Sequence, residues 1–116
     1  MKLKGIELRG PYKVEFDDMW FEVYDDKDNR IYYEDSDGYW TKNEYDERDN
    51  LIYFENSDGY WIKNVYDERH NVIYYENSDG DWAKSEYDER NNQTHYEDSF
   101  GNIVDRCNSW IINRVK

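Results

Sequence analysis

Residues 54–74 read FENSDGYWIKNVYDERHNVIY, and two close copies flank them: YEDSDGYWTKNEYDERDNLIY over residues 33–53 and YENSDGDWAKSEYDERNNQTH over residues 75–95. Residues 12–32 form a degraded first copy, and residues 96–116 begin as a fifth copy and then diverge. Repeat arrays need atypical end copies as caps. Because 116 residues suffice for one small domain, we expect residues 1–116 to form a single domain built on a 21-residue repeat.

Each copy contains two turn signals of similar chemistry. In NSDG (residues 56–59) and DERD (residues 46–49), Asn or Asp stands where its side chain can bond the backbone of a type I turn. The fourth position then calls for a positive φ, which Gly, Asn, Asp and His tolerate best. We therefore predict positive φ, and turn roles rather than catalysis, at Gly38, Gly59, Gly80 and Gly101 and at Asp28, Asp49, His70 and Asn91.

The segments between the turns predict strands. They are five to seven residues long, as in YWIKNVY and LIYFE, and rich in Tyr, Trp and β-branched residues. No apolar pattern of period 3.6 indicates a helix. The fold class is therefore all-β: an antiparallel β-hairpin array of about ten strands in a twisted or spiralled sheet. If the array does not curl around its aromatic side chains, one aromatic face stays exposed, and we then expect a homodimer through that face.

The repeat length adds a constraint. Because 21 is odd and side chains alternate along a strand, identical turns would send the next Trp to the opposite face. We predict one irregularity per copy, such as a bulge, which keeps Trp40, Trp61 and Trp82 on one side. Trp20 lies one residue closer to Tyr24 than Trp40 lies to Tyr45. We therefore expect the irregularity of the first copy at a different place.

The composition and charge of the chain limit the kinds of partner that it can bind. Leu, Ile, Val and Phe make up about 18% of the chain, in the range of disordered proteins, but 13 Tyr and 5 Trp favour an ordered fold. Residues 15–101 carry 26 acidic and 8 basic side chains, a field that repels nucleic acid and anionic membranes and attracts basic protein surfaces. A lone Cys107, and an N-terminus without a signal-like apolar run, predict a cytoplasmic location.

The motif YDERDNLIY and its copies resemble the YD repeat of Rhs and toxin-shell proteins, over roughly residues 24–101. The resemblance implies β-hairpins that spiral into a wall, with no catalytic residues in the repeats. A handful of repeats is too few to enclose a cargo, so only the hairpin fold carries over. YYENSDG is also similar to the cell-wall choline-binding repeat, which implies aromatic cages for a quaternary ammonium or a glycan.

The sequence predicts no enzyme, no cofactor and no metal site. DSDG (residues 35–38) offers too few alternating ligands for a calcium loop, and Ser36, Ser57 and Ser78 recur without a recurring His. The candidate partner-binding residues are instead rows of repeated acids: Glu34, Glu55 and Glu76 (continued by Glu97); Asp46, Asp67 and Asp88; Glu47, Glu68 and Glu89; Asp37, Asp58 and Asp79. Aromatic alternatives are Trp40, Trp61, Trp82, Tyr39 and Tyr60.

Three functions remain open. Rows of carboxylates about 10 Å apart, two strands per step, favour a nucleic-acid mimic, such as a phage-borne inhibitor of a CRISPR effector or restriction enzyme. An interaction or self-associating scaffold acting through the aromatic face is the second function, and choline or glycan binding is the third. The acids could instead only solubilise the sheet, since Lys42, Lys63, Lys84, Arg48, Arg69 and Arg90 supply each copy with countercharges.

Overall fold

The computed structural model describes residues 2–3, 6–7 and 11–105, and within them all regular structure is β. The twelve strands are β1 (Lys2–Leu3), β2 (Ile6–Glu7), β3 (Tyr12–Phe16), β4 (Trp20–Asp25), β5 (Arg30–Asp35), β6 (Trp40–Tyr45), β7 (Leu51–Asn56), β8 (Trp61–Tyr66), β9 (Val72–Asn77), β10 (Trp82–Tyr87), β11 (Gln93–Asp98) and β12 (Ile103–Asp105). β1 and β2 pair as a hairpin that the repeat did not predict.

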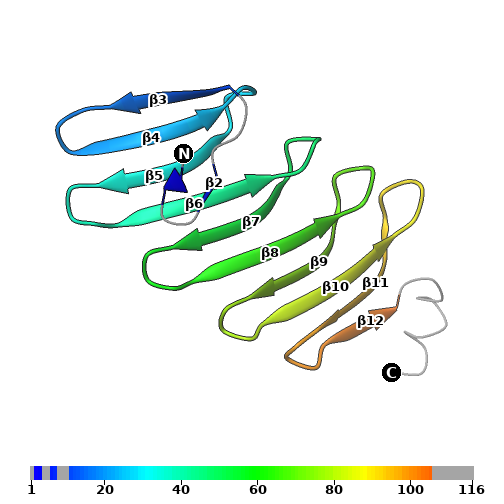
Figure 1. Cartoon of the computed structure of the whole chain (residues 1–116). Helices are drawn as coiled ribbons and strands as arrows, with labels where there is room; N and C mark the ends of the chain where they lie inside the picture. The colour runs from blue at the N-terminus through cyan, green and yellow to red at the C-terminus, as the bar shows by residue number, and fades with distance from the viewer. Residues whose placement is uncertain (1, 4–5, 8–10, 106–116) are drawn as a thin grey trace. The chain divides into compact units, whose positions relative to one another are not determined.

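Strands β3 to β12 form one open antiparallel sheet of ten strands in chain order (Figure 1). This confirms the all-β hairpin array and its strand number. The chain divides into two compact units, residues 1–61 and 62–116, with the boundary at the start of β8. Cys107 and most of the predicted C-terminal cap lie outside the described residues, and a single domain stays a prediction.

Both turns of each copy have the geometry that their residues predict. In the Gly turns (residues 35–39, 56–60, 77–81 and 98–102), the N–H of Gly38 donates to the carbonyl of Asp35 at 3.0 Å. In the Asp turns (residues 25–29, 46–50, 67–71 and 88–92), Asp49 donates to Asp46 in the same way, at 3.0 Å. All eight predicted positions have positive φ, from 64° at Asp28 to 89° at Gly101, so His70 is confirmed as a turn residue.

One bulge per copy resolves the odd repeat length. Tyr45 pairs with Leu51 and Glu44 pairs with Tyr53, so Ile52 is an extra residue in β7. Such a bulge restores the phase of side-chain alternation for the next copy. Equivalent register shifts occur at the other three Asp turns, between Val23 and Tyr24, Val65 and Tyr66, and Glu86 and Tyr87. The prediction of one irregularity per copy is confirmed.

The expected displacement of the irregularity in the first copy is wrong, because its bulge lies at the equivalent place, beside Tyr24. The preceding turn differs instead. The N–H of Asp17 donates to the carbonyl of Trp20 at 2.9 Å, which leaves a two-residue loop, whereas the Gly turns enclose three residues. In the first copy the Trp itself, Trp20, therefore lies opposite Asp35. In the next copy the residue after the Trp, Thr41, lies opposite the equivalent Asn56.

The apolar core of the first unit is small. Val23 and Tyr32 are 1% and 0% exposed, and Phe21, Ile31 and Trp40 pack against them. The rings of Tyr32 and Trp40 are stacked with centroids 6.4 Å apart. Large apolar side chains elsewhere stay exposed, with Phe16 and Phe100 both at 76%. A single sheet covers neither of its own faces, so stability is concentrated where aromatic and aliphatic side chains meet.

We predict that Val23→Ala lowers the free energy of unfolding by about 2 kcal/mol, because it removes buried methyl groups and leaves a cavity. The matched control is Val65→Ala in β8, whose Val is 49% exposed, and it is expected to cost less than about 1 kcal/mol. Urea unfolding followed by circular dichroism measures both. Equal losses would contradict the assignment of the core.

Candidate functional site

The predicted glutamate row shares one sheet face with tryptophan and lysine. Glu34 lies directly opposite Trp40, and Lys42 lies opposite Glu55 with its Nζ 3.9 Å from Oε1. The Nζ of Lys42 is also 5.1 Å from the ring centroid of Trp40. Because Glu55 faces Lys42 across the strands, its charge is largely compensated, whereas Glu34 lies opposite Trp40 and Phe21 and has no cation directly across from it.

Tyrosines bind the same carboxylates. The hydroxyls of Tyr32 and Tyr53 donate to Glu34 and Glu55 of their own strands at 2.7 and 3.0 Å. Burial raises the pKa of Tyr53 to about 12, and the bond to Glu55 adds to the rise. The pKa of Tyr32 rises for the same two reasons, burial first.

The second unit repeats this pattern. Lys63 pairs with Glu76, and Lys84 pairs with Glu97. The Nζ of Lys84 lies 5.4 Å from the ring centroid of Trp82. The three tryptophans of the aromatic alternative site, Trp40, Trp61 and Trp82, are half-buried. Trp40 and Trp82 each have a lysine of their own strand over the ring.

The aspartates that begin the Asp turns accept hydrogen bonds from the backbone of their own turns. Oδ1 of Asp46 accepts the N–H groups of Arg48 and Asn50 at 2.9 and 3.0 Å, and Asp67 and Asp88 make the same two bonds. These bonds, the one from the Asn50 backbone above all, hold the pKa of Asp46 below its usual value. Each of these carboxylates is already hydrogen-bonded within its own turn and is therefore less available to a partner.

Cations of the Asp turns link one copy to the next. Lys27 donates through Nζ to the carbonyl of Glu47 at 3.0 Å and lies 3.7 Å from Asp49. In the second unit Arg69 donates to the carbonyl of Asp88 and to Oδ1 of Asn91, both at 2.7 Å. Glu47, Glu68 and Glu89 are exposed at this edge, and Glu68 lies 4.0 Å from the guanidinium of Arg69, so this edge carries cations as well as acids.

The Gly turns carry acid without countercharge. Asp37, Asp58 and Asp79 are exposed, none forms an ion pair within residues 11–105, and the four Gly turns contain no Lys or Arg. Tyr39 beside them is 37% exposed and contacts Tyr33 edge-on, at a centroid distance of 6.5 Å, while Tyr60 is half-buried. Among the predicted rows, this one leaves its charge most available.

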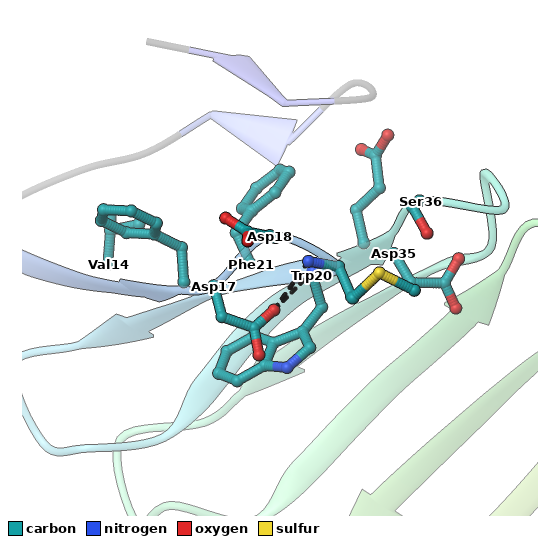
Figure 2. A pocket seen from close by; sticks show the side chains of 10 residues that line it. Val14, Asp17, Asp18, Trp20, Phe21, Asp35 and Ser36 are labelled. Atoms are coloured by element: carbon teal, nitrogen blue, oxygen red, sulfur yellow. Dashed lines mark hydrogen bonds between the residues drawn. The ribbon is translucent and has the colours of Figure 1, made fainter.

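A hollow opens at the end of the first unit that carries its Gly turns, between the turn from β3 to β4 and the first Gly turn (Figure 2). Its volume is about 460 Å³. Val14, Phe16, Met19, Trp20 and Phe21 give it apolar walls, and Asp17, Asp18, Glu34, Asp35 and Ser36 complete the lining. We name this hollow, together with Asp37 and Asp58, the acidic turn edge of the first unit.

Sequence reasoning missed this hollow and the role of the repeated serines. Oγ of Ser57 accepts the N–H of Trp40 at 3.2 Å, while the N–H of Ser57 donates to the carbonyl of Trp40 at 2.9 Å. Ser99 holds Trp82 through the same two bonds. Each such serine joins its turn to the preceding copy, and its spacing of 17 residues from the Trp was the signal available in the sequence.

Within the described residues, no group of three or more His, Cys, Asp or Glu side chains is arranged to hold a metal ion. That part of the chain also contains no helix long and apolar enough to cross a membrane. Comparison with protein-family models and with curated protein sequences finds no match to this chain. The resemblance to YD repeats therefore stays a prediction.

The turn aspartates predict a measurable acid sensitivity. Because the pKa of Asp46 is lowered on folding, its contribution is complete above the unfolded value of about 4 and is lost as pH falls further, through the folded value. We expect Asp46→Ala to lower the urea midpoint at pH 7, whereas Asp46→Asn keeps the acceptor and stays close to the native midpoint. Asp46→Asn should also lose less stability than the native chain between about pH 4 and pH 2. A native-like acid dependence in Asp46→Asn would contradict this assignment.

Proposed function

We propose that this chain is a non-enzymatic, protein-binding repeat protein that binds a basic protein surface through the acidic turn edge of its first unit. The observation that supports this most is the meeting of unpaired carboxylates with an apolar hollow. Asp37 and Asp58 are exposed and form no ion pair in the described part of the chain, and Asp18 lines a hollow walled by Phe16 and Phe21.

The chemistry of this edge fits a Lys or Arg side chain of the partner. Both side chains have an aliphatic stem that packs on apolar surface while the charged head stays near water. In the hollow the stem would contact Phe16 and Met19, and the head would lie near the carboxylates of Asp17, Asp18 and Glu34. A guanidinium or ammonium over an aromatic ring gains about 0.5 to 2 kcal/mol.

A nucleic-acid mimic is the sharper form of this proposal. Gly turns follow one another at every second strand, so neighbouring acids on this edge are roughly 10 Å apart. A row of this kind suits the basic groove of a nucleic-acid-binding protein, such as a CRISPR effector or a restriction enzyme, and would exclude its nucleic acid. The chain itself, being acidic, would not bind nucleic acid directly.

The other two functions have less support. The scaffold alternative places a partner or a second copy on the aromatic face, where Trp40 already packs against Tyr32. The choline or glycan alternative needs open aromatic rings, but Lys42 and Lys84 lie over the rings of Trp40 and Trp82. A basic protein surface thus remains the partner that the free groups favour.

Charge reversal at the acidic turn edge tests the proposal. We expect immobilised native chain to capture basic proteins from a bacterial lysate, and capture to fall as salt rises because exposed charge is screened within about 10 Å. Asp37→Lys/Asp58→Lys should lose these proteins. The matched control, Asp26→Lys/Glu47→Lys, makes the same charge change at the Asp turns and should keep them. Equal capture by both variants, or equal loss, would refute the site.

Competition with duplex DNA separates the two forms of the proposal in the same experiment. If the partner is a nucleic-acid-binding protein, adding DNA displaces it from the native chain. Proteins that resist displacement by DNA but are lost from Asp37→Lys/Asp58→Lys would indicate a basic partner of another kind and contradict mimicry.

A further inference from the structure

Strand β3 ends the strand order of the larger sheet. It pairs with β4 on one side, and no other strand of the described residues pairs with it on the other. All five of its residues are exposed. An edge strand presents backbone groups ready to pair with another strand, and natural edges are commonly protected by bulges, proline or unpaired charge. The residues of β3, YKVEF, contain neither proline nor a bulge.

The register of the β3–β4 hairpin fixes which backbone groups face outward. The N–H of Asp17 bonds to the carbonyl of Trp20 at 2.9 Å, and from there Glu15 pairs with Glu22 and Lys13 with Tyr24. Backbone hydrogen bonding alternates along an antiparallel strand, so Lys13 and Glu15 direct their backbone groups toward β4. The backbone groups of Val14 and Phe16 consequently point away from the sheet.

The side chains of β3 are self-complementary. Alternation places Val14 and Phe16, 46% and 76% exposed, on one face with Tyr12. Lys13 and Glu15 lie on the other face, with side chains 52% and 51% exposed. Reversing the strand end to end about Val14 exchanges the positions of Lys13 and Glu15. It also exchanges one aromatic residue, Tyr12, with the other, Phe16.

We propose that β3 is the contact through which two copies of this chain associate, with the two strands antiparallel about a two-fold axis at Val14. The outward backbone groups of the two Val14 residues then bond to each other, as an isologous contact requires. Lys13 lies opposite Glu15 of the second copy, and Glu15 lies opposite Lys13. On the other face, Phe16 lies opposite Tyr12 of the second copy.

Charge selects this register over its neighbours. A shift by two residues one way sets Lys13 opposite Lys13 of the second copy, and a shift the other way sets Glu15 opposite Glu15. Like charges directly opposite across strands are destabilising, while opposite charges contribute about 0.2 to 1 kcal/mol. Lys13 also contacts Asp28 of its own chain at 2.9 Å and Glu15 at 3.8 Å, so the ion pairs across the axis compete with these contacts.

The contact is small, and the dimer is correspondingly weak. Two five-residue strands bury less than the roughly 1,200 Å² of a tight interface, so we expect a dissociation constant on the order of 10 to 500 µM. Sedimentation of the full chain from about 10 µM to 1 mM, in about 150 mM salt to screen its net charge, should show a monomer–dimer equilibrium. A chain that stays monomeric throughout this range would overturn the proposal.

Paired charge reversals test the register. Lys13→Glu and Glu15→Lys each set like charges opposite one another, so each alone should be at least tenfold weaker in self-association. An equimolar mixture of the two restores both opposite pairs and should dimerise like the native chain. Lys84→Glu and Glu97→Lys, which make the same charge changes away from β3, should each dimerise normally. A mixture no stronger than its components would overturn the register.

Val14→Pro tests the strand edge separately. Because the N–H of Val14 points away from β4, proline there removes both Val14 N–H bonds across the dimer axis and none of the hairpin. We expect native circular dichroism with loss of the dimer, and a folded variant that dimerises normally would refute the edge contact. If this variant unfolds, the charge-reversal mixture decides. Neither experiment involves another protein, so their failure would leave the proposed binding of a basic partner untouched.

Discussion

An odd repeat length and the two-residue period of a β-strand cannot both hold without one irregularity per copy. The chain meets this constraint by adding one residue after each Asp turn, as with Ile52 between Leu51 and Tyr53. If Ile52 instead paired with Glu44 in a continuous register, Lys42 would lie opposite Phe54 and not Glu55. Core packing, the pairing of Lys42 with Glu55 and the stacking of copies all depend on the resulting phase.

The acidic side chains of each copy differ in what they contact. Glu55, Glu76 and Glu97 lie opposite lysines. Aspartates at the start of the Asp turns bond to the backbone of their own turns. Lys27 and Arg69 of the Asp turns bond to the following copy. At the Gly turns, Asp37 and Asp58 are exposed and have no cation in their own turn. Free acid and free apolar surface thus occur together at one end of the first unit, and that coincidence underlies the proposed binding of a basic protein.

The local chemistry of the turns made them predictable from the sequence. Gly59 and His70 have little in common except tolerance of positive φ, and the recurrence of such residues in every copy identified both turns. The odd repeat length then indicated one irregularity per copy. The position of the bulge was not predictable, because Ile52 fits a regular strand as well as a bulged one. The pairing of Lys42 with Glu55 depends on that position, so this ion pair could not be anticipated. The hollow depends on a first turn that is one residue shorter, which the spacing of Trp20 indicated only as an irregularity.

Nuclear Overhauser effects between backbone protons across β6 and β7 would reveal the register that the bulge at Ile52 sets. The bulge predicts cross-strand contacts between Glu44 and Tyr53 and between Tyr45 and Leu51, with no residue of β6 directly opposite Ile52. Corresponding contacts should recur at the other three Asp turns. A continuous register, with Glu44 opposite Ile52 and Lys42 opposite Phe54, would contradict a bulge at Ile52.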